Sequence, residues 1–222
     1  MVRYQFNFSV VWESLPFFAE GVGVTVMVAV LAMLLGFIWG MAICLCHLSR
    51  LRWLSNVAQA YITFFRGTPV VMQLFWVHYS LPIVVGIALP PFLSGVTALA
   101  LNLGAFISEA LRAGIQSVSK GQWEAAFSLG MDATQVMRRI VFPQAFRTVV
   151  PPLGNLWVSL FKDSSIVSLI GVADLMNQGK KVSVLSYRPV EVFTFLALTY
   201  FVLTYPQARL VDKFYKMHRV AH

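Results

Sequence analysis

The sequence predicts an all-α, polytopic membrane protein built as a bundle of five transmembrane helices. The first observation is composition: 58% of the 222 residues are hydrophobic and 12% are charged, which is about half the charged share of a soluble domain. The second is spacing, because the gaps between Glu20 and Arg50 and between Arg66 and Glu109 hold no charged side chain. A spanning helix needs about 20 mostly apolar residues, so both gaps are long enough, and much of the surface is expected to face lipid.

The same composition excludes several other classes of protein. A disordered chain has low hydrophobicity, and a disulfide scaffold has many cysteines, whereas this chain has two. The net charge of +8 could indicate a nucleic-acid surface, but the basic residues gather between apolar runs, as in the positively charged inner loops of membrane proteins. We therefore expect membrane lipid as a partner and no nucleic acid.

The spans are predicted in order from the gaps between charges. The first run is too long, and begins too far along the chain, for a cleavable signal peptide. The next gap holds two spans, with the break supplied by Pro82 and by Pro90 and Pro91, and the fourth span is interrupted by Lys162 and Asp163. One domain over residues 1–222 then has spans at about 21–48, 54–81, 92–113, 148–173 and 191–209.

The distribution of Lys and Arg predicts the orientation of the five spans. With the N-terminus outside and the C-terminus cytoplasmic, the inner segments hold eleven basic residues and the outer segments hold four. Lys180 and Lys181 lie in an outer loop, an exception for which the sequence offers no physical reason.

The cytoplasmic loop at about 119–146 is patterned like folded structure. A short helix over 122–129 is expected to end at Gly130, because glycine alone adopts positive φ without steric cost. Asp132 or Thr134 can cap a second helix that continues through Arg139 and Ile140 and is expected to stop at Pro143. Since so short a helix is marginal alone in water, we expect it to dock on something else.

Particular residues of this loop resemble the EAA loop of ABC importer permeases, in which a coupling helix sits on the cytoplasmic ATPase. The wider sequence is similar to the polar amino acid permease group in FFRGTP at 64–69, SEALRAGIQSV at 108–118, PPLGN at 151–155 and SLFKDSS at 159–165. Phe142 departs from the leucine usual before the loop's proline but stays apolar. The loop residues that carry the resemblance are Glu124, Ala125, Ala126, Gly130, Ile140 and Pro143.

The resemblance implies a type I ABC importer permease fold, with five transmembrane helices and a short cytoplasmic coupling helix. It implies a permease subunit of a bacterial inner membrane importer for small polar amino acids. The expected partners are a dimer of ABC ATPase subunits, a second permease (the same chain or a paralogue) and an extracytoplasmic solute-binding protein. ATP and Mg would be used by the ATPase, so we expect this chain to bind no cofactor or metal, to have no catalytic residue and not to be an enzyme. Its Gly179-Lys180 pair also lacks the other residues of a phosphate-binding loop.

Polar residues within the predicted spans mark a candidate substrate pathway, because charge inside a membrane is costly and usually functional. Residues three, four or seven apart share one helix face, and three such polar faces would line a cavity. Arg66 or Lys162 could take the carboxylate of an amino acid, and Glu109 or Asp163 its ammonium group. The candidates are Arg66, Gln73, Asn102, Glu109, Asn155, Ser159, Lys162 and Asp163.

Two alternatives remain open at this point. Arg66 could pair with Glu109, and Lys162 with Asp163, only to hold helices together. The chain could also be half of an ATP-independent secondary transporter or channel, whose ion site would lie at a broken helix. A membrane enzyme is the weakest reading, since no catalytic constellation is present.

Overall fold

The computed structural model describes residues 5–218, apart from the side chains at positions 214 and 216–218. All regular elements within this part of the chain are helical, which confirms the all-α prediction. In chain order they are α1 (Ser9–Glu13), α2 (Leu15–His47), α3 (Arg52–Gly67), α4 (Val70–Phe75), the π-helix η1 (Trp76–Ser80), α5 (Leu81–Val85), α6 (Pro91–Gln116), α7 (Lys120–Ser128), α8 (Ala133–Val136), the π-helix η2 (Met137–Val141), α9 (Phe142–Asp163), the 3-10 helix η3 (Ser164–Ile170), α10 (Leu175–Ser186) and α11 (Pro189–His218).

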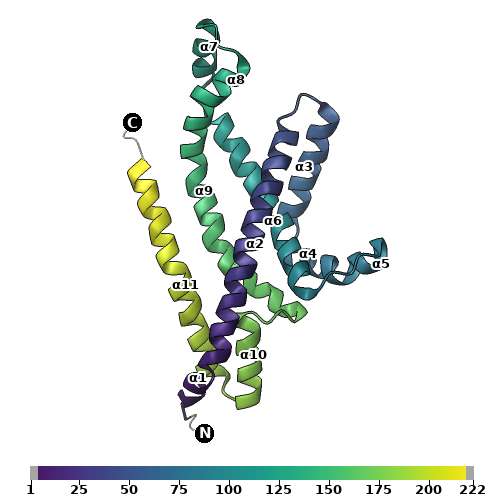
Figure 1. The fold of residues 1–222 in the computed structure, drawn as a ribbon, viewed down its shortest axis with the longest axis vertical. Helices are drawn as coiled ribbons and strands as arrows, with labels where there is room; N and C mark the ends of the chain where they lie inside the picture. Colours follow the sequence, from purple (N-terminus) through teal and green to yellow (C-terminus); the bar gives the residue numbers. More distant parts are fainter. Residues whose placement is uncertain (1–4, 219–222) are drawn as a thin grey trace.

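Three of these helices, α2, α6 and α11, are each long and apolar enough to cross a membrane. Two bent helix pairs raise the number of possible crossings to five. Figure 1 shows the long helices side by side, with the N-terminal end of α2 beside α10 and with α7 and α8 at the opposite end.

The centre of the bundle is the contact between α2 and α6. A Cβ atom added to Gly36 would lie 3.1 Å from the carbonyl oxygen of Ala100, and one added to Gly40 would lie 2.8 Å from that of Gly104. Because only glycine lets two helix backbones approach this closely, these positions form a close-packing face. The main cluster of buried apolar residues, which includes Ala32 and Leu103, surrounds this contact.

The predicted second span, 54–81, is not one straight helix. The chain turns by 108° between α3 and the segment Val70–Val85. Thr68 is extended, with φ −111° and ψ 145°, because the ring of Pro69 disfavours helical backbone in the residue before it. The expected break at Pro82 is also wrong, since Pro82 lies in the first turn of α5 and the chain leaves the helix at Gly86, whose φ is +77°.

The predicted helix stop at Pro143 is wrong as well. Pro143 lies in the first turn of α9, directly after η2, and the chain stays helical from Ala133 to Asp163. Proline lacks an N–H donor and its ring clashes with the carbonyl four residues earlier. The π-helical turn before it changes the hydrogen-bond register and accommodates the ring without ending the helix.

Helix α10 was not predicted, because its sequence is too polar to be read as a span. The buried Asp174 caps its N-terminus by accepting a hydrogen bond from the Asn177 N–H at 2.9 Å. Lys180 on this helix donates to the hydroxyl of Ser168 at 2.9 Å. This contact gives Lys180 a structural role that the charge count could not explain, while Lys181 is exposed.

Candidate translocation path and coupling element

Two cavities lie along the helices that carry the predicted pathway residues. The first, of about 230 Å³, lies between α4, α6 and α9. Its polar lining comes from Asn102 on α6 and from Ser159 and Asp163 on α9, which the sequence placed on separate helix faces. The remaining lining is apolar and consists of Val70, Leu99, Leu103, Phe106, Leu156 and Leu160.

The second cavity, of about 410 Å³, lies between α3 and α6 and is more polar. It contains two of the predicted residues, Arg66 and Glu109. Phe106 lines both cavities, so the two spaces adjoin at this residue. The other lining residues are Gln59, Ile62, Thr63, Gly67 and Arg112.

Gln73 holds the bend between α3 and α4 and ties it to α6. Its side-chain amide nitrogen donates to the carbonyl of Phe65 at 2.9 Å and to the hydroxyl of Thr68 at 2.8 Å. Its oxygen accepts from Asn102 at 3.0 Å. Arg66 and Gln73 therefore do not share a face of one helix, as their spacing predicted, because the bend separates them.

The charged residues do not form the ion pairs considered from the sequence, which were Arg66 with Glu109 and Lys162 with Asp163. Glu109 accepts from the Nε of Arg112 at 3.0 Å, and no ion pair within the described residues joins it to Arg66. The guanidinium of Arg66 instead lies 5.5 Å from the centre of the Phe106 ring, a distance typical of a cation–π contact. Because Arg112 neutralises Glu109, Arg66 is left as the cation in this cavity without a carboxylate partner in the described chain.

The polar face predicted on the fourth span is only partly assembled. Ser159 lines the first cavity, as does the neighbouring candidate Asp163, but Asn155 and Lys162 line neither cavity. No ion pair joins Lys162 to Asp163 in the part of the chain that the structure describes. α9 ends at Asp163 and continues as η3, so the chain changes helix type at the predicted interruption.

Several residues that line the cavities were not predicted from the sequence. Gln59, Thr63 and Arg66 follow one another at intervals of four and three, which is the spacing of one helix face. Phe106 lies between Asn102 and Glu109 on α6, where one more apolar residue in an apolar span gives no signal of a path.

The coupling element consists of α7, α8 and η2, at the end of the bundle farthest from the N-terminus (Figure 1). Ala126 is 3% exposed and packs in a small core with Val118, Val136 and Val141. Glu124 and Ala125 lie on the exposed side of α7. Ile140 is half-buried against the same core and Pro143 is exposed.

The turn after α7 has the conformation predicted for it. Gly130 has φ +77° and donates its N–H to the carbonyl of Phe127 at 2.9 Å. Asp132 then caps α8 in a capping box with Gln135. Phe127 and Leu129 are 49% and 82% exposed, so this end of the bundle presents apolar side chains outward beside the exposed Glu124.

Comparison with known proteins identifies the family. The binding-protein-dependent transport system inner membrane component family matches residues 32–216. The chain is 36% identical to the arginine transport system permease protein ArtQ of Bacillus subtilis (strain 168), over 89% of this chain and 90% of that protein. It is 33% identical to the glutamine transport system permease protein GlnP of Escherichia coli (strain K12), over 90% and 92%.

Solved structures agree with these sequence relatives. A crystal structure of an amino acid ABC transporter with histidines has a chain that matches with a TM-score of 0.91 and 37% identity, over 96% of this chain and all of that one (100%). The MetNI methionine ABC transporter, at 19% identity and a TM-score of 0.71, shares the fold. The chain therefore belongs to the family of binding-protein-dependent transport system inner membrane components, as a multi-pass ABC importer permease.

Proposed function

We propose that this permease forms the membrane path of an ATP-driven importer for polar amino acids. One observation carries the proposal. A single chain of this family contains both polar cavities within its helix bundle and a short helix, α7, whose outer face is exposed at the end of the bundle that we place in the cytoplasm. The relatives named for arginine and glutamine transport support amino acids as the substrate class.

The proposed assembly contains three kinds of partner for this chain. Its coupling element offers Glu124, Phe127 and Leu129 to a partner, and we assign that partner as one subunit of an ABC ATPase dimer. ATP and Mg are bound there, where ATP is hydrolysed, and this chain takes no cofactor. A second permease completes the path, and an extracytoplasmic solute-binding protein delivers the amino acid.

The N-terminus lies outside and the C-terminus lies in the cytoplasm in this proposal. The excess of basic residues in the segments that would be inside supports this orientation. It places α7 on the ATPase side of the membrane and α10 on the side of the solute-binding protein.

ATP binding drives transport by favouring one of two conformations. Closure of the ATPase dimer moves α7 and the turn at Gly130, and this motion shifts the permease pair from inward to outward access. The coupling element must therefore contact the ATPase differently in the two states, since a ligand shifts an equilibrium only through its differential affinity.

The cavities suggest how an amino acid is held on its way. The guanidinium of Arg66 is suited to the carboxylate of the substrate, and Asp163 to its ammonium group, because charge-assisted hydrogen bonds are the strongest available. Asn102 and Ser159 supply neutral donors and acceptors between them. Phe106 stands where the two cavities adjoin, and an amino acid that passes it meets Arg66 and Asp163 in turn.

Reconstitution of the co-purified complex tests this function. Its ATPase activity is measured with the solute-binding protein across a panel of acidic, basic and amide amino acids and apolar controls. We expect stimulation by one or a few polar amino acids only. Stimulation by none, or equally by the apolar controls, would refute the substrate class.

A further inference from the structure

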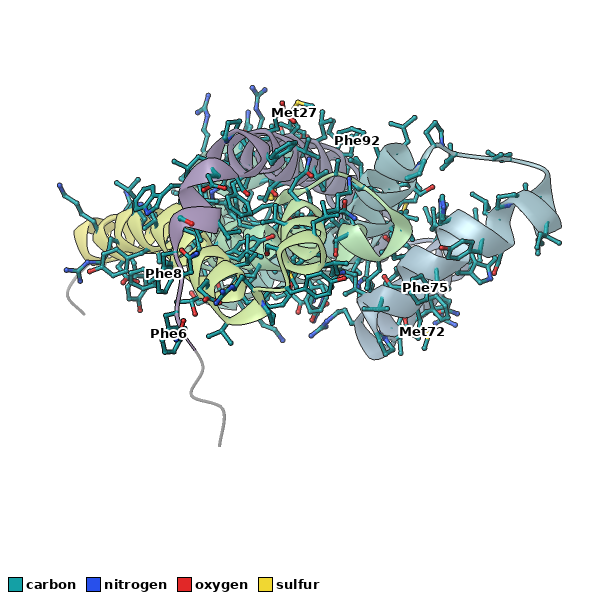
Figure 2. The ribbon with its side chains drawn as sticks, turned by 90° about the horizontal axis from the view of Figure 1, so that it is seen from below. Phe6, Phe8, Met27, Met72, Phe75 and Phe92 are labelled. Carbon is teal, nitrogen blue, oxygen red and sulfur yellow. The ribbon has the colours of Figure 1, made fainter. Side chains whose placement is uncertain are left out.

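Helix α11 is more open to the membrane than α2 or α6. Only 17% of its most apolar stretch is buried against the rest of the chain, compared with 61% for α6. Figure 1 shows α11 along one side of the bundle beside α9, and Figure 2 shows its C-terminal part reaching outward on the side opposite Met72 and Phe75. Lipid therefore has access to most of this helix, and lipid headgroups lie against the residues at its ends.

The apolar stretch of α11 gives the level of those headgroups. Residues 192–208 contain no charged side chain and form about 25 Å of helix, close to the hydrocarbon thickness of about 30 Å. Arg209 is the first charged residue after this stretch, and Asp212 and Lys213 follow it. Tyr205 lies one turn before Arg209, and tyrosine is enriched at the membrane–water interface. Residues 205–213 therefore lie at the level of the lipid headgroups.

The contacts of α9 with α6 and α11 place this segment at the same level. A Cβ atom added to Gly114 on α6 would lie 2.1 Å from the side chain of Val149 on α9, and one added to Gly154 would lie 2.7 Å from that of Val211. Because α6 and α9 run in opposite directions (Figure 1), Val211 lies about 7 Å along α6 from Gly114. That is the level of Glu109, which ends the charge-free stretch of α6.

The charged side chains of this segment lie on an exposed face. Tyr205, Arg209 and Asp212 follow at intervals of four and three, the spacing of one helix face, and Lys213 lies four residues after Arg209; all four are exposed. The guanidinium of Arg209 is 5.6 Å from the centre of the Tyr205 ring, within the range of a cation–π contact. Among the described residues, no ion pair joins Asp212 to Arg209 or Lys213. This face therefore offers two cations and an acid that do not neutralise one another.

A headgroup that carries both a phosphate and an ammonium group matches these charges. Arginine and lysine donate N–H groups to phosphate oxygens, and a carboxylate accepts from an ammonium group. A purely anionic headgroup would set its negative charge against Asp212, and a choline headgroup has no N–H to donate.

We propose that Arg209, Asp212 and Lys213 bind the headgroup of phosphatidylethanolamine. Arg209 and Lys213 hold the phosphate, Asp212 accepts from the ammonium group, and the ring of Tyr205 lies toward the acyl chains. In the proposed orientation the site faces the cytoplasmic leaflet. It requires only that α11 crosses the membrane, so it goes beyond the importer function and stands apart from it.

Thermal unfolding of the purified full-length chain in detergent tests the site, since a ligand that binds only the folded state raises its stability. Midpoints are measured without lipid and with phosphatidylethanolamine, phosphatidylcholine or phosphatidylglycerol of identical acyl chains. Phosphatidylethanolamine should raise the midpoint by about 5 °C more than either other lipid. Asp212→Asn should abolish this preference, whereas Asp212→Glu should retain it. Asp132→Asn, which changes an exposed acid on the coupling element, is the matched control and should respond as the wild type does.

Three midpoint results would overturn the proposal. Equal midpoints with phosphatidylethanolamine and phosphatidylcholine would show that the ammonium group is not recognised. An equal or larger rise with phosphatidylglycerol would indicate a site for anionic lipid. A preference that survives Asp212→Asn would place the site elsewhere.

Two further measurements separate lipid binding from other causes of stabilisation. Soluble phosphoethanolamine, which has no acyl chains, should leave the midpoint unchanged, and a rise equal to that of the lipid would identify a soluble ligand instead. Native mass spectrometry counts retained lipid without any unfolding step. Arg209→Gln should retain about fivefold less phosphatidylethanolamine, and undiminished retention would contradict the role of Arg209.

Discussion

At the scale of single residues, the polar side chains within the bundle divide into structural and pathway groups. Gln73 is 5% exposed and satisfies backbone groups at the bend, so its role is structural. Arg66 and Asp163 line cavities without a carboxylate or ammonium partner among the described residues, which is the condition expected of groups that take a charged substrate.

Gln73→Leu should lower the stability of the permease by about 1–3 kcal/mol, because it leaves the partners of the amide without their hydrogen bonds. The thermal unfolding midpoint of the purified protein in detergent measures this loss. Gln144→Leu is the matched control, since Gln144 is exposed and donates only to the carbonyl of Ile140. An equal shift in both variants would contradict the role given to Gln73.

At the scale of elements, the contact between α2 and α6 depends on the absence of side chains at Gly36 and Gly40. Gly40→Val would place a Cβ 2.8 Å from the carbonyl oxygen of Gly104, and such overpacking costs about 1–3 kcal/mol. Gly23→Val on the same helix is the control, because a Cβ there meets nothing within 4 Å. We expect a lower unfolding temperature for the first variant only, and equal temperatures would refute the close contact.

The turn after α7 yields a prediction about coupling. Gly130→Pro removes the N–H that bonds to Phe127 and forces φ from +77° toward about −65°. The variant should insert into the membrane normally but lose both uptake and the stimulation of the ATPase by the solute-binding protein.

A matched control separates the turn from the helix before it. Gly121→Ala in α7 should keep both activities, since a Cβ at that position meets nothing within 4 Å. Normal transport by the Gly130→Pro protein would remove α7 and its turn from the coupling role.

The sequence predicted correctly those structural elements that depend on residues close together in the chain. Gaps between charges located α2, α6 and α11, and a glycine after a short helix predicted the positive φ at Gly130. The bend at Thr68 also has a local signal in the following Pro69, which the seven-residue spacing of Arg66 and Gln73 does not reflect. Pro143 was misread because a π-helical turn, which depends on the surrounding packing, offset the usual effect of proline.

The candidate path was less predictable because it depends on how helices pack. Asn102, Ser159 and Asp163 come together only because α6 and α9 enclose a common space. The partner of Glu109 was Arg112 on its own helix rather than Arg66 on another, and spacing alone could not choose between them. Phe106 adjoins both cavities, a position that composition and periodicity do not indicate.

At the scale of the whole molecule, polar cavities within the bundle and a coupling element at one end explain why this chain works as a permease. The chain is helical from Ala133, directly after the turn that contains Gly130, to Asp163 at the first cavity. Motion of α7 on an ATPase can therefore be passed through α8, η2 and α9 to the cavity. This continuity is what links transport to ATP in the proposed importer.

Uptake by proteoliposomes tests that link most directly. Vesicles containing the permease with its ATPase, and matched vesicles with the permease alone, are supplied with the solute-binding protein and a labelled polar amino acid, with and without ATP on the ATPase side. We predict uptake only when the ATPase and ATP are both present. Uptake that persists without the ATPase would show an ATP-independent transporter and contradict the account.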